Sequence, residues 1–200
     1  ARRLLMGTLH LSQDASGYFV RDVYCQKNYG RADFKAVAPG PNALPDDAII
    51  NTEHTWPQSR FNRAFQPDIQ KTDMHHLFPT DSKMNAIRGN KKFGEVPQST
   101  TALPCQTAKF GPITGPVPDS DEHFEPPQVH KGNVARALFY FSVRYSIKID
   151  ADEEYYLRKW HKEDPVDAFE VQRNEAIFRL QGDRNPFIDH PELVDMIADF

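Results

Sequence analysis

An acid and an imidazole stand next to each other in the segment INTEHTWPQSRF, where Glu53 precedes His54. Metal binding and proton transfer both use side chains of these types. The β-branched residues before the pair predict a strand over residues 47–56 that ends at Pro57. Because neighbouring side chains on a regular strand point to opposite faces, Glu53 and His54 would then point apart.

A short helix is predicted further along, in the segment TDSKMNAIRGN. Asp81 or Ser82 can cap its N-terminus and Gly89 can end it, which leaves about two turns between them. Asn85 and Arg88 are three residues apart and would share one face of this helix. The helix would therefore present an amide and a guanidinium together.

These four side chains suit one kind of chemistry. His54 can act as a general base near neutral pH. The oxygens of Glu53 and Asn85 are hard ligands that suit Mg²⁺ or Ca²⁺ better than a softer metal. Arg88 offers a fork for a phosphate. A base, a hard metal and an arginine are together the groups that phosphodiester hydrolysis requires.

The segments that must position these groups change character along the chain. The patterns predict a short helix in residues 1–13, a strand over 19–26, a loop over 58–72, a short strand or extended segment over 73–79, irregular structure over 94–128, and helices over 133–149, 152–163, 164–182 and 191–200. Asp164 is the expected cap of the third of these helices and Gly182 its expected end. Strands followed by helices predict the α+β class. The core candidates in the helical third are Leu138, Phe139, Phe141, Val143, Trp160, Phe169 and Phe178.

Length and composition are those of a globular protein. The 200 residues suit one domain, or at most two small ones, and 39% of them are apolar. No apolar run is long enough to span a membrane. A net charge of −4 argues against nucleic-acid binding when taken alone, but residues 53–92 carry seven basic and four acidic side chains. This local excess is a weak indication of an anionic partner, since a solvated face of mixed charge is the usual explanation.

The chain has two cysteines, Cys25 and Cys105. An even number fits one disulfide in an oxidising compartment and equally fits two buried thiols, so their pairing stays open. No CxxC pair occurs, which argues against a structural zinc site. The opening ARRLLMGTLHL is a poor signal peptide because its apolar part is too short.

The sequence resembles the endonuclease I family of bacterial periplasmic and secreted nucleases, within the His-Me finger (ββα-metal) group. The matching segments are NTEHTWPQSRFN, KTDMHHLFPTDSKMNAIRGNKKFGEV, EPPQVHKGNVARALFYFSVRY and DPVDAFEVQRNEAIFRLQGDRNPFIDHPE. Their combination in this order is highly specific, and EHTWPQS is closer to the secreted members. The resemblance implies one nuclease domain over residues 1–200. It would hold a ββα-metal core of a small sheet and a short helix at about 47–92, and a helical scaffold at about 130–200.

The resemblance also implies individual roles. His54 matches the general base that activates water, and Glu53 and Asn85 match the ligands of one Mg²⁺, for which Mn²⁺ or Ca²⁺ could substitute. The backbone carbonyl of Lys71 is expected to hold the imidazole and leave its Nε2 free to accept a proton. Products would carry 5′-phosphate and 3′-hydroxyl ends.

Further basic side chains are assigned on the same basis. Arg88 would either bind phosphate or brace the site. Arg63 or Arg60 would replace the arginine that holds the cleaved phosphate in periplasmic relatives, because the loop that carries it is shorter here. The expected substrate-binding residues are Arg60, Lys71, Lys91, Lys92 and Arg136. For Arg136, a buried brace is an equal alternative.

The histidine pair in DMHHLF has no assigned role. Periplasmic relatives read DLHNL at this place, which leaves the role of His76 open. We expect His75 and His76 to be structural, one packed inward and the other outward by strand alternation. A zinc site made by His54, His75 and His76 is a less favoured alternative.

We therefore predict a secreted or periplasmic, Mg²⁺-dependent, sequence-nonspecific endonuclease, a monomer without membrane contact whose signal peptide has been removed. It would cleave DNA and RNA, and its grip on the phosphate backbone would weaken steeply with salt. Alternatives are a catalytically silent nucleic-acid-binding or inhibitor-binding module and a metallophosphodiesterase for small substrates. At Glu53 and His54 we predict that strand pairing stops, with a twist or bulge that lets both side chains reach one phosphate.

Overall fold

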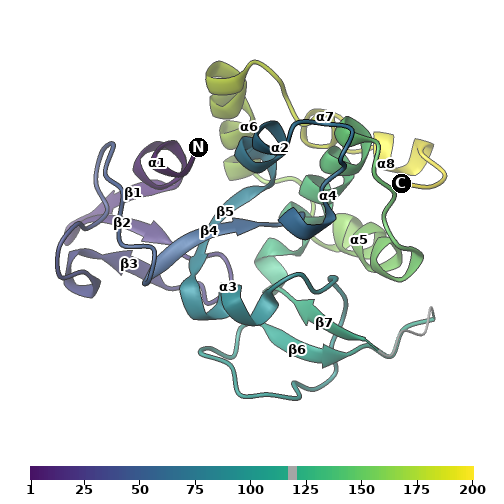
Figure 1. Cartoon of the computed structure of the whole chain (residues 1–200), viewed down its shortest axis with the longest axis horizontal. Helices are drawn as coiled ribbons and strands as arrows, with labels where there is room; N and C mark the ends of the chain where they lie inside the picture. The colour runs from purple at the N-terminus through teal and green to yellow at the C-terminus, as the bar shows by residue number, and fades with distance from the viewer. Residues whose placement is uncertain (117–120) are drawn as a thin grey trace.

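Three small antiparallel sheets and a helical C-terminal third make up the chain in the computed structural model, which describes residues 1–116 and 121–200 (Figure 1). The strands are β1 Leu11–Asp14, β2 Gly17–Arg21, β3 Asn28–Gly30, β4 Ile50–His54, β5 Leu77–Asp81, β6 Lys109–Pro112 and β7 Glu122–Glu125. The helices are α1 Arg2–Leu4, α2 Pro67–Thr72, α3 Ser82–Arg88, α4 Lys131–Tyr145, α5 Ala151–Glu163, α6 Ala168–Gln181, α7 Pro186–Asp189 and α8 Leu193–Met196, with a π-helical turn at Leu5–Leu9 and short 3₁₀ turns at Arg31–Asp33, Gln58–Arg60, Met74–His76 and Gln128–His130. This architecture confirms the α+β prediction.

Strands β4 and β5 form a two-stranded antiparallel sheet, and α3 follows β5 directly. The pairing runs from Ile50 opposite Asp81 to His54 opposite Leu77. The carboxylate of Asp81 caps α3 by accepting two backbone N–H groups at 2.9 Å, and Gly89 ends the helix with a φ of 56°. Both ends of α3 are therefore as predicted.

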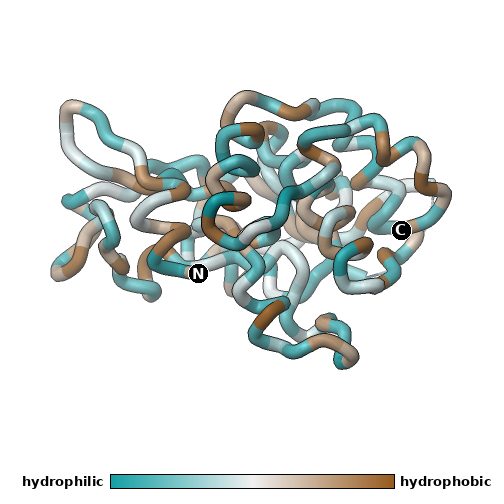
Figure 2. The backbone as a smooth tube through the Cα atoms, turned by 90° about the horizontal axis from the view of Figure 1, so that it is seen from above, coloured by the Kyte–Doolittle hydropathy of each residue, from teal (hydrophilic) through white to brown (hydrophobic). Residues whose placement is uncertain are grey.

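Helix α4 runs through the larger of two apolar cores. Leu138, Phe139, Phe141 and Trp160 are fully buried there, as predicted. The second core lies where the N-terminal residues meet β2, β4 and β5. Figure 2, seen at right angles to Figure 1, places the β1–β3 part at one end of the long axis and the C-terminus toward the other.

Three other core predictions are wrong. Val143, Phe169 and Phe178 are 53%, 45% and 44% exposed. Apolar residues occur on several sides of α6, so their pattern does not identify its buried face. That face is largely polar: α6 buries Glu170, Arg173, Asn174 and Ile177.

The limits of several segments also differ from prediction. Helix α6 is capped by Asp167 rather than Asp164, because Glu170 completes a capping box with Asp167. The segment 94–128 contains β6 and β7, and residues 117–120 of it lie outside the described residues. A strand β1 begins within 1–13 and ends at Asp14, β2 ends at Arg21, and β4 is limited to Ile50–His54. Helix α4 ends at Tyr145, short of the predicted residue 149. Other differences are a helix α2 within the loop 58–72, a 3₁₀ turn at the start of 73–79, and a helix α8 of four residues within 191–200.

A disulfide joins Cys25 to Cys105, with 5.5 Å between their Cα atoms, and decides the pairing that the sequence left open. It links the loop after β2 to the loop before β6. Within the described ranges, none of the helices has the length and apolar character needed to cross a membrane.

Removing this disulfide should lower the free energy of unfolding by about 4 kcal/mol, because the bridge closes a long loop and restricts the unfolded chain. The double variant Cys25→Ser/Cys105→Ser, unfolded in urea beside the wild type, measures this loss. An unchanged midpoint with an unchanged slope would contradict it.

Three buried histidines should make the fold sensitive to mild acid. Burial lowers the pKa of His10 and His76 well below the usual value and that of His130 to about 3. Because the unfolded chain binds protons below pH ~6.5 and the folded chain does not, stability should be complete above that pH and fall below it, by about 1.4 kcal/mol per histidine at pH 5.5. Urea unfolding at pH 7.5 and 5.5 measures the difference. A His130→Gln variant should show a smaller difference, and equal stabilities of the wild type at both pH values would refute the expectation.

Candidate active site

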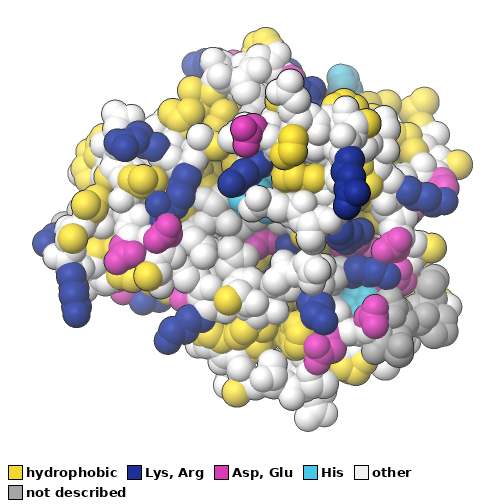
Figure 3. Space-filling view, in the orientation of Figure 1, with side chains coloured by type: hydrophobic (Ala, Val, Ile, Leu, Met, Phe, Trp, Pro, Cys, Tyr) yellow, Lys and Arg dark blue, Asp and Glu magenta, His cyan; other side chains and the backbone are white. Residues whose placement is uncertain are grey.

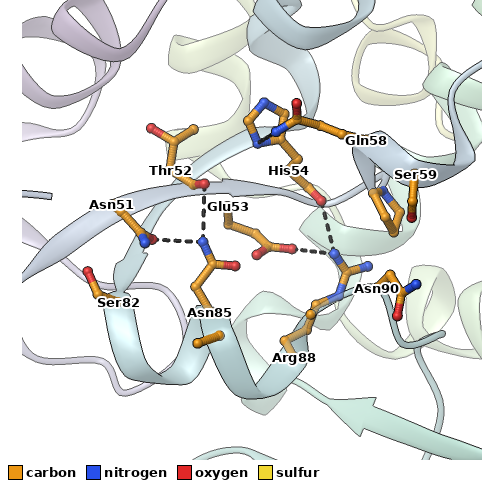
Figure 4. Close-up of a pocket in the computed structure, with 13 residues that line it drawn as sticks. Asn51, Thr52, Glu53, His54, Gln58, Ser59, Ser82, Asn85, Arg88 and Asn90 are labelled. Atoms are coloured by element: carbon orange, nitrogen blue, oxygen red, sulfur yellow. Dashed lines mark hydrogen bonds and ion pairs between the residues drawn. The ribbon is translucent and has the colours of Figure 1, made fainter. Parts of the chain in front are cut away.

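A pocket of about 330 Å³ lies where β4 meets α3 and the turn that follows β4 (Figure 4). Glu53, His54, Asn85 and Arg88 all line it. The structure thus brings together the four residues whose types first indicated chemistry.

Strand pairing does not stop at Glu53 and His54. Glu53 pairs with Phe78 and His54 with Leu77. The backbone N–H of Thr55 also donates to the carbonyl of His76 at 3.0 Å. The carboxylate of Glu53 and the ring of His54 lie on opposite sides of β4 (Figure 4). The predicted bulge is therefore wrong.

Both side chains still reach one pocket because β4 has an open edge. Within the described residues, β4 pairs with β5 alone. Side chains of α3 cover part of the other edge: Asn85 Nδ2 donates to the carbonyl of Thr52 at 3.2 Å, and Arg88 Nη1 donates to that of His54 at 2.9 Å. A ligand that lies along this edge can meet groups from both faces of the strand.

Glu53 is 1% exposed, and its Oε1 accepts from Arg88 Nη1 at 2.7 Å. Burial raises the pKa of this carboxyl group, while the guanidinium of Arg88 opposes the rise. Arg88 is itself 1% exposed and also donates to the carbonyl of Thr55 at 2.7 Å. We considered phosphate binding and bracing of the site as roles for Arg88, and these contacts fit bracing.

The amide of Asn85 is oriented by two acceptors. Its Nδ2 donates to Asn51 Oδ1 at 2.7 Å and to the carbonyl of Thr52, which turns its Oδ1 toward the carboxylate of Glu53 (Figure 4). A carboxylate and an amide oxygen side by side are suitable ligands for a hard divalent cation. Within residues 1–116 and 121–200, no group of three or more His, Cys, Asp or Glu side chains could hold a metal ion. A cation held here by Glu53 and Asn85 would take its other ligands from water or substrate.

The ring of His54 is held by Nε2, which donates to the carbonyl of Lys71 at 3.1 Å. This bond leaves Nδ1 as the acceptor nitrogen, where the amide Nε2 of Gln58 lies 3.5 Å away. The predicted partner is correct, but the predicted free nitrogen is wrong. Burial lowers the pKa of His54, which favours the neutral imidazole that a base requires.

The other basic side chains take different positions. Arg136 is 1% exposed, and its guanidinium contacts both carboxylate oxygens of Glu170 at 2.7 and 2.6 Å. It is the buried brace, so its assignment to substrate binding is wrong. Arg60 bonds to Glu153 at 3.1 Å, and Lys92 bonds to Asp152 at 3.1 Å.

Three basic residues extend toward solvent. Arg63 and Lys71 are exposed, and the side chain of Lys91, 39% exposed, lies 3.6 Å from Glu122. None of these three is among the residues that line the pocket. Figure 3, in the orientation of Figure 1, shows a hollow in the face turned to the viewer. Carboxylate and histidine atoms are visible inside the hollow, and Lys and Arg side chains lie on several sides of it.

His75 and His76 both point inward, which corrects the prediction of one inward and one outward. They lie in a 3₁₀ turn, so strand alternation does not apply to them. His75 Nε2 donates to the carbonyl of Asp183 at 3.2 Å, whereas the ring of His76 packs 4.4 Å from that of Phe141. The ring of His76 also lies 5.4 Å from that of His54, but in the described part of the chain no group of three or more His, Cys, Asp or Glu side chains could hold a metal ion.

Two polar residues that lie against the predicted site residues were missed from the sequence. Asn51 orients Asn85, and Gln58 lies next to the acceptor nitrogen of His54. Asn51 precedes Glu53 by two residues, so strand alternation could have placed it on the same face. Gln58 follows Pro57 in a turn, and a turn has no regular alternation of side chains from which the direction of Gln58 could be predicted.

Comparison with known proteins identifies the family to which the chain belongs. A family model described as Endonuclease I matches residues 8–192. The chain is 38% identical over 167 residues to a protein named extracellular ribonuclease from Bacillus amyloliquefaciens, a match that covers 74% of this chain and 53% of that one. It is 29% identical over 178 residues to a protein named endonuclease-1 from Buchnera aphidicola subsp. Baizongia pistaciae, with 88% and 67% covered. It is 32% identical over 118 residues to a protein named extracellular deoxyribonuclease from Aeromonas hydrophila, with 58% and 48% covered.

The chain spans about half the length of the first of these relatives. Since the family model covers nearly all of it, the chain belongs to the endonuclease I family.

Proposed function

We propose that this chain is a divalent-metal-dependent, sequence-nonspecific endonuclease that hydrolyses phosphodiester bonds of DNA and RNA and leaves 5′-phosphate ends. The observation that carries the proposal is one pocket in which the imidazole of His54 faces the edge of β4 from one side and the side-chain oxygens of Glu53 and Asn85 face it from the other. In this proposal β4, β5 and α3 are the ββα-metal core. Names of relatives include both a ribonuclease and deoxyribonucleases, which supports a substrate class of nucleic acid.

His54 is the general base. Its Nε2 proton is engaged by the carbonyl of Lys71, so Nδ1 is the atom that accepts a proton from the attacking water. Because the ring is already fixed in the free protein, substrate binding carries no additional entropy cost for orienting it. The lowered pKa keeps Nδ1 unprotonated at neutral pH.

Glu53 and Asn85 hold the cation, for which we propose Mg²⁺. When bound there, a divalent cation supplies charge that stabilises the developing negative charge of the phosphate and the leaving oxygen. Arg88 keeps the carboxylate of Glu53 in place, and Asn51 keeps the amide of Asn85 turned toward it. The exposed side chains of Arg63, Lys71 and Lys91 contact backbone phosphates, which carry no base information.

A secreted or periplasmic location accompanies this function. The disulfide between Cys25 and Cys105 is of the kind that persists in oxidising compartments. The relatives that match the chain include proteins named extracellular or periplasmic nucleases.

Plasmid digestion tests the mechanism. The wild type should nick and linearise plasmid in Mg²⁺ and stop in EDTA, and His54→Ala should lower the rate 10²–10⁴-fold because no other group accepts the proton. His190→Ala, which removes an exposed histidine of the C-terminal part, is the matched control and should cleave normally. Full activity of His54→Ala would contradict the mechanism. DNA binding without cleavage by the wild type would favour a silent binding module, and rapid hydrolysis of a small diester with intact plasmid would favour a phosphodiesterase for small substrates.

Arg88→Ala should lower the free energy of unfolding by about 3–5 kcal/mol, because it leaves the buried carboxylate of Glu53 without its partner. The double variant Arg88→Ala/Glu53→Gln should recover part of this loss, since the remaining side chain is uncharged. Urea unfolding of the two variants and the wild type measures both effects. If Arg88→Ala were as stable as the wild type, Arg88 would have no bracing role.

A further inference from the structure

A side-chain amide lies against the acceptor nitrogen of the proposed base, although it has no part in the steps proposed so far. Gln58 Nε2 is 3.5 Å from His54 Nδ1, and both residues line the pocket (Figure 4). The other ring nitrogen donates to the carbonyl of Lys71, so Nδ1 is an acceptor and the amide N–H of Gln58 is its partner. The nitrogen that must accept a proton therefore has an amide beside it before substrate binds.

This contact is weak enough for a water molecule to replace it. N–H donors usually lie about 2.9–3.0 Å from their acceptors, and a separation of 3.5 Å is at the far limit of a hydrogen bond. Gln58 is exposed, and among the described residues no donor contacts its amide oxygen. The amide thus offers an unused acceptor next to the place where the attacking water must lie.

The backbone that carries Gln58 is held in place by the residues around it. Gln58 begins the 3₁₀ turn that follows β4. Trp56, which is 0% exposed, donates from its indole Nε1 to the carbonyl of Arg60 at the end of this turn, at 3.0 Å. The guanidinium of Arg60 is bonded to Glu153 of α5 at 3.1 Å. Because the turn is fixed, the amide can rotate about its own side-chain bonds and still stay within reach of the pocket.

We propose that Gln58 positions the attacking water for His54. The water takes the place of the amide N–H at Nδ1 and donates one proton to that nitrogen. The amide oxygen of Gln58 accepts the second proton of the water in a hydrogen bond. A glutamine amide orients the attacking water of GTPases in a similar way. The inference rests on the proposed function, because it concerns the nucleophile of that reaction.

Two acceptors do what one cannot. A water bonded only to Nδ1 can rotate about that bond, whereas a second acceptor fixes the direction of its lone pair. One proton then passes to Nδ1 while the water oxygen forms its bond to phosphorus. The bond from phosphorus to the 3′ oxygen breaks with its electron pair, and that oxygen takes a proton from solvent. The second proton stays on the attacking oxygen, so Gln58 orients the water without taking up a proton.

Gln58→Met tests this role, because it keeps the length of the side chain and removes the amide. Cleavage of a labelled oligonucleotide at saturating substrate and Mg²⁺ should be about 10–100-fold slower, as expected for a misplaced nucleophile. The KM, the Mn²⁺ affinity measured by calorimetry and the urea midpoint should all equal those of the wild type, because the side chain is exposed and holds neither cation nor fold. Gln128→Met is the matched control: Gln128 is also exposed and begins a 3₁₀ turn after a proline, but it does not line the pocket. It should cleave at the wild-type rate.

Gln58→Glu separates orientation of the water from mere occupation of space. It restores an acceptor oxygen at the same position, so its saturated rate should exceed that of Gln58→Met, although its charge should raise the KM for an anionic substrate. A wild-type saturated rate in Gln58→Met, a change in its KM or urea midpoint alone, or equally slow Met and Glu variants would overturn the inference. The proposed function would survive each of these results as long as His54→Ala is inactive, whereas full activity of His54→Ala would overturn that function itself.

Discussion

The whole site depends on one buried guanidinium. Arg88 reaches from α3 to three oxygens of one chain segment: a carboxylate oxygen of Glu53 and the carbonyls of His54 and Thr55. A strand edge beneath a helix leaves carbonyl groups that cost free energy unless they are hydrogen-bonded, and the planar fork of arginine can satisfy several at once. The same contacts offset the cost of burying a carboxylate. The ring of Phe93, 4.4 Å from the guanidinium, covers it from the side. The position of the strand edge, the helix and the proposed metal ligand thus follows from a single side chain.

The imidazole of His54 depends on the helical third of the chain, although His54 itself lies on β4. Its Nε2 is held by the carbonyl of Lys71 near the end of α2, and the next turn is tied to the helices. The carboxylate of Asp73 accepts from the hydroxyls of Tyr140 and Tyr145 on α4 at 2.9 and 2.8 Å. Arg173 of α6 donates to the carbonyl of Met74, in the 3₁₀ turn, and to that of Leu77, at the start of β5. The C-terminal helices therefore help to position the imidazole of His54, because they hold the segment to which its ring is bonded.

Local signals predicted the fold best where local interactions decide it. Helix α3 begins and ends as predicted because its cap, Asp81, and its stop, Gly89, act within one turn of their own positions. The start of α6 was misplaced because two acids, Asp164 and Asp167, precede it. Glu170 forms the capping box with the nearer one, Asp167, and its carboxylate also pairs with Arg136 of α4. That choice depends on a residue from another helix. Strands β6 and β7 were missed because each has only four residues and the segment around them is rich in Gly and Pro, which is typical of loops.

The residue types of the site were also predictable, whereas its geometry was not. The chemistry of Glu53, His54 and Asn85 follows from their side chains. The bulge was inferred on the assumption that two groups must share a strand face to act on one substrate. A strand with an open edge removes that requirement, because its two faces meet at the edge. A phosphate at that edge would have a carboxylate on one side and an imidazole on the other, which is the arrangement that in-line attack needs. Regular alternation along β4 is therefore what separates the proposed base from the proposed metal ligands, and a bulge that placed both on one face would have removed that separation.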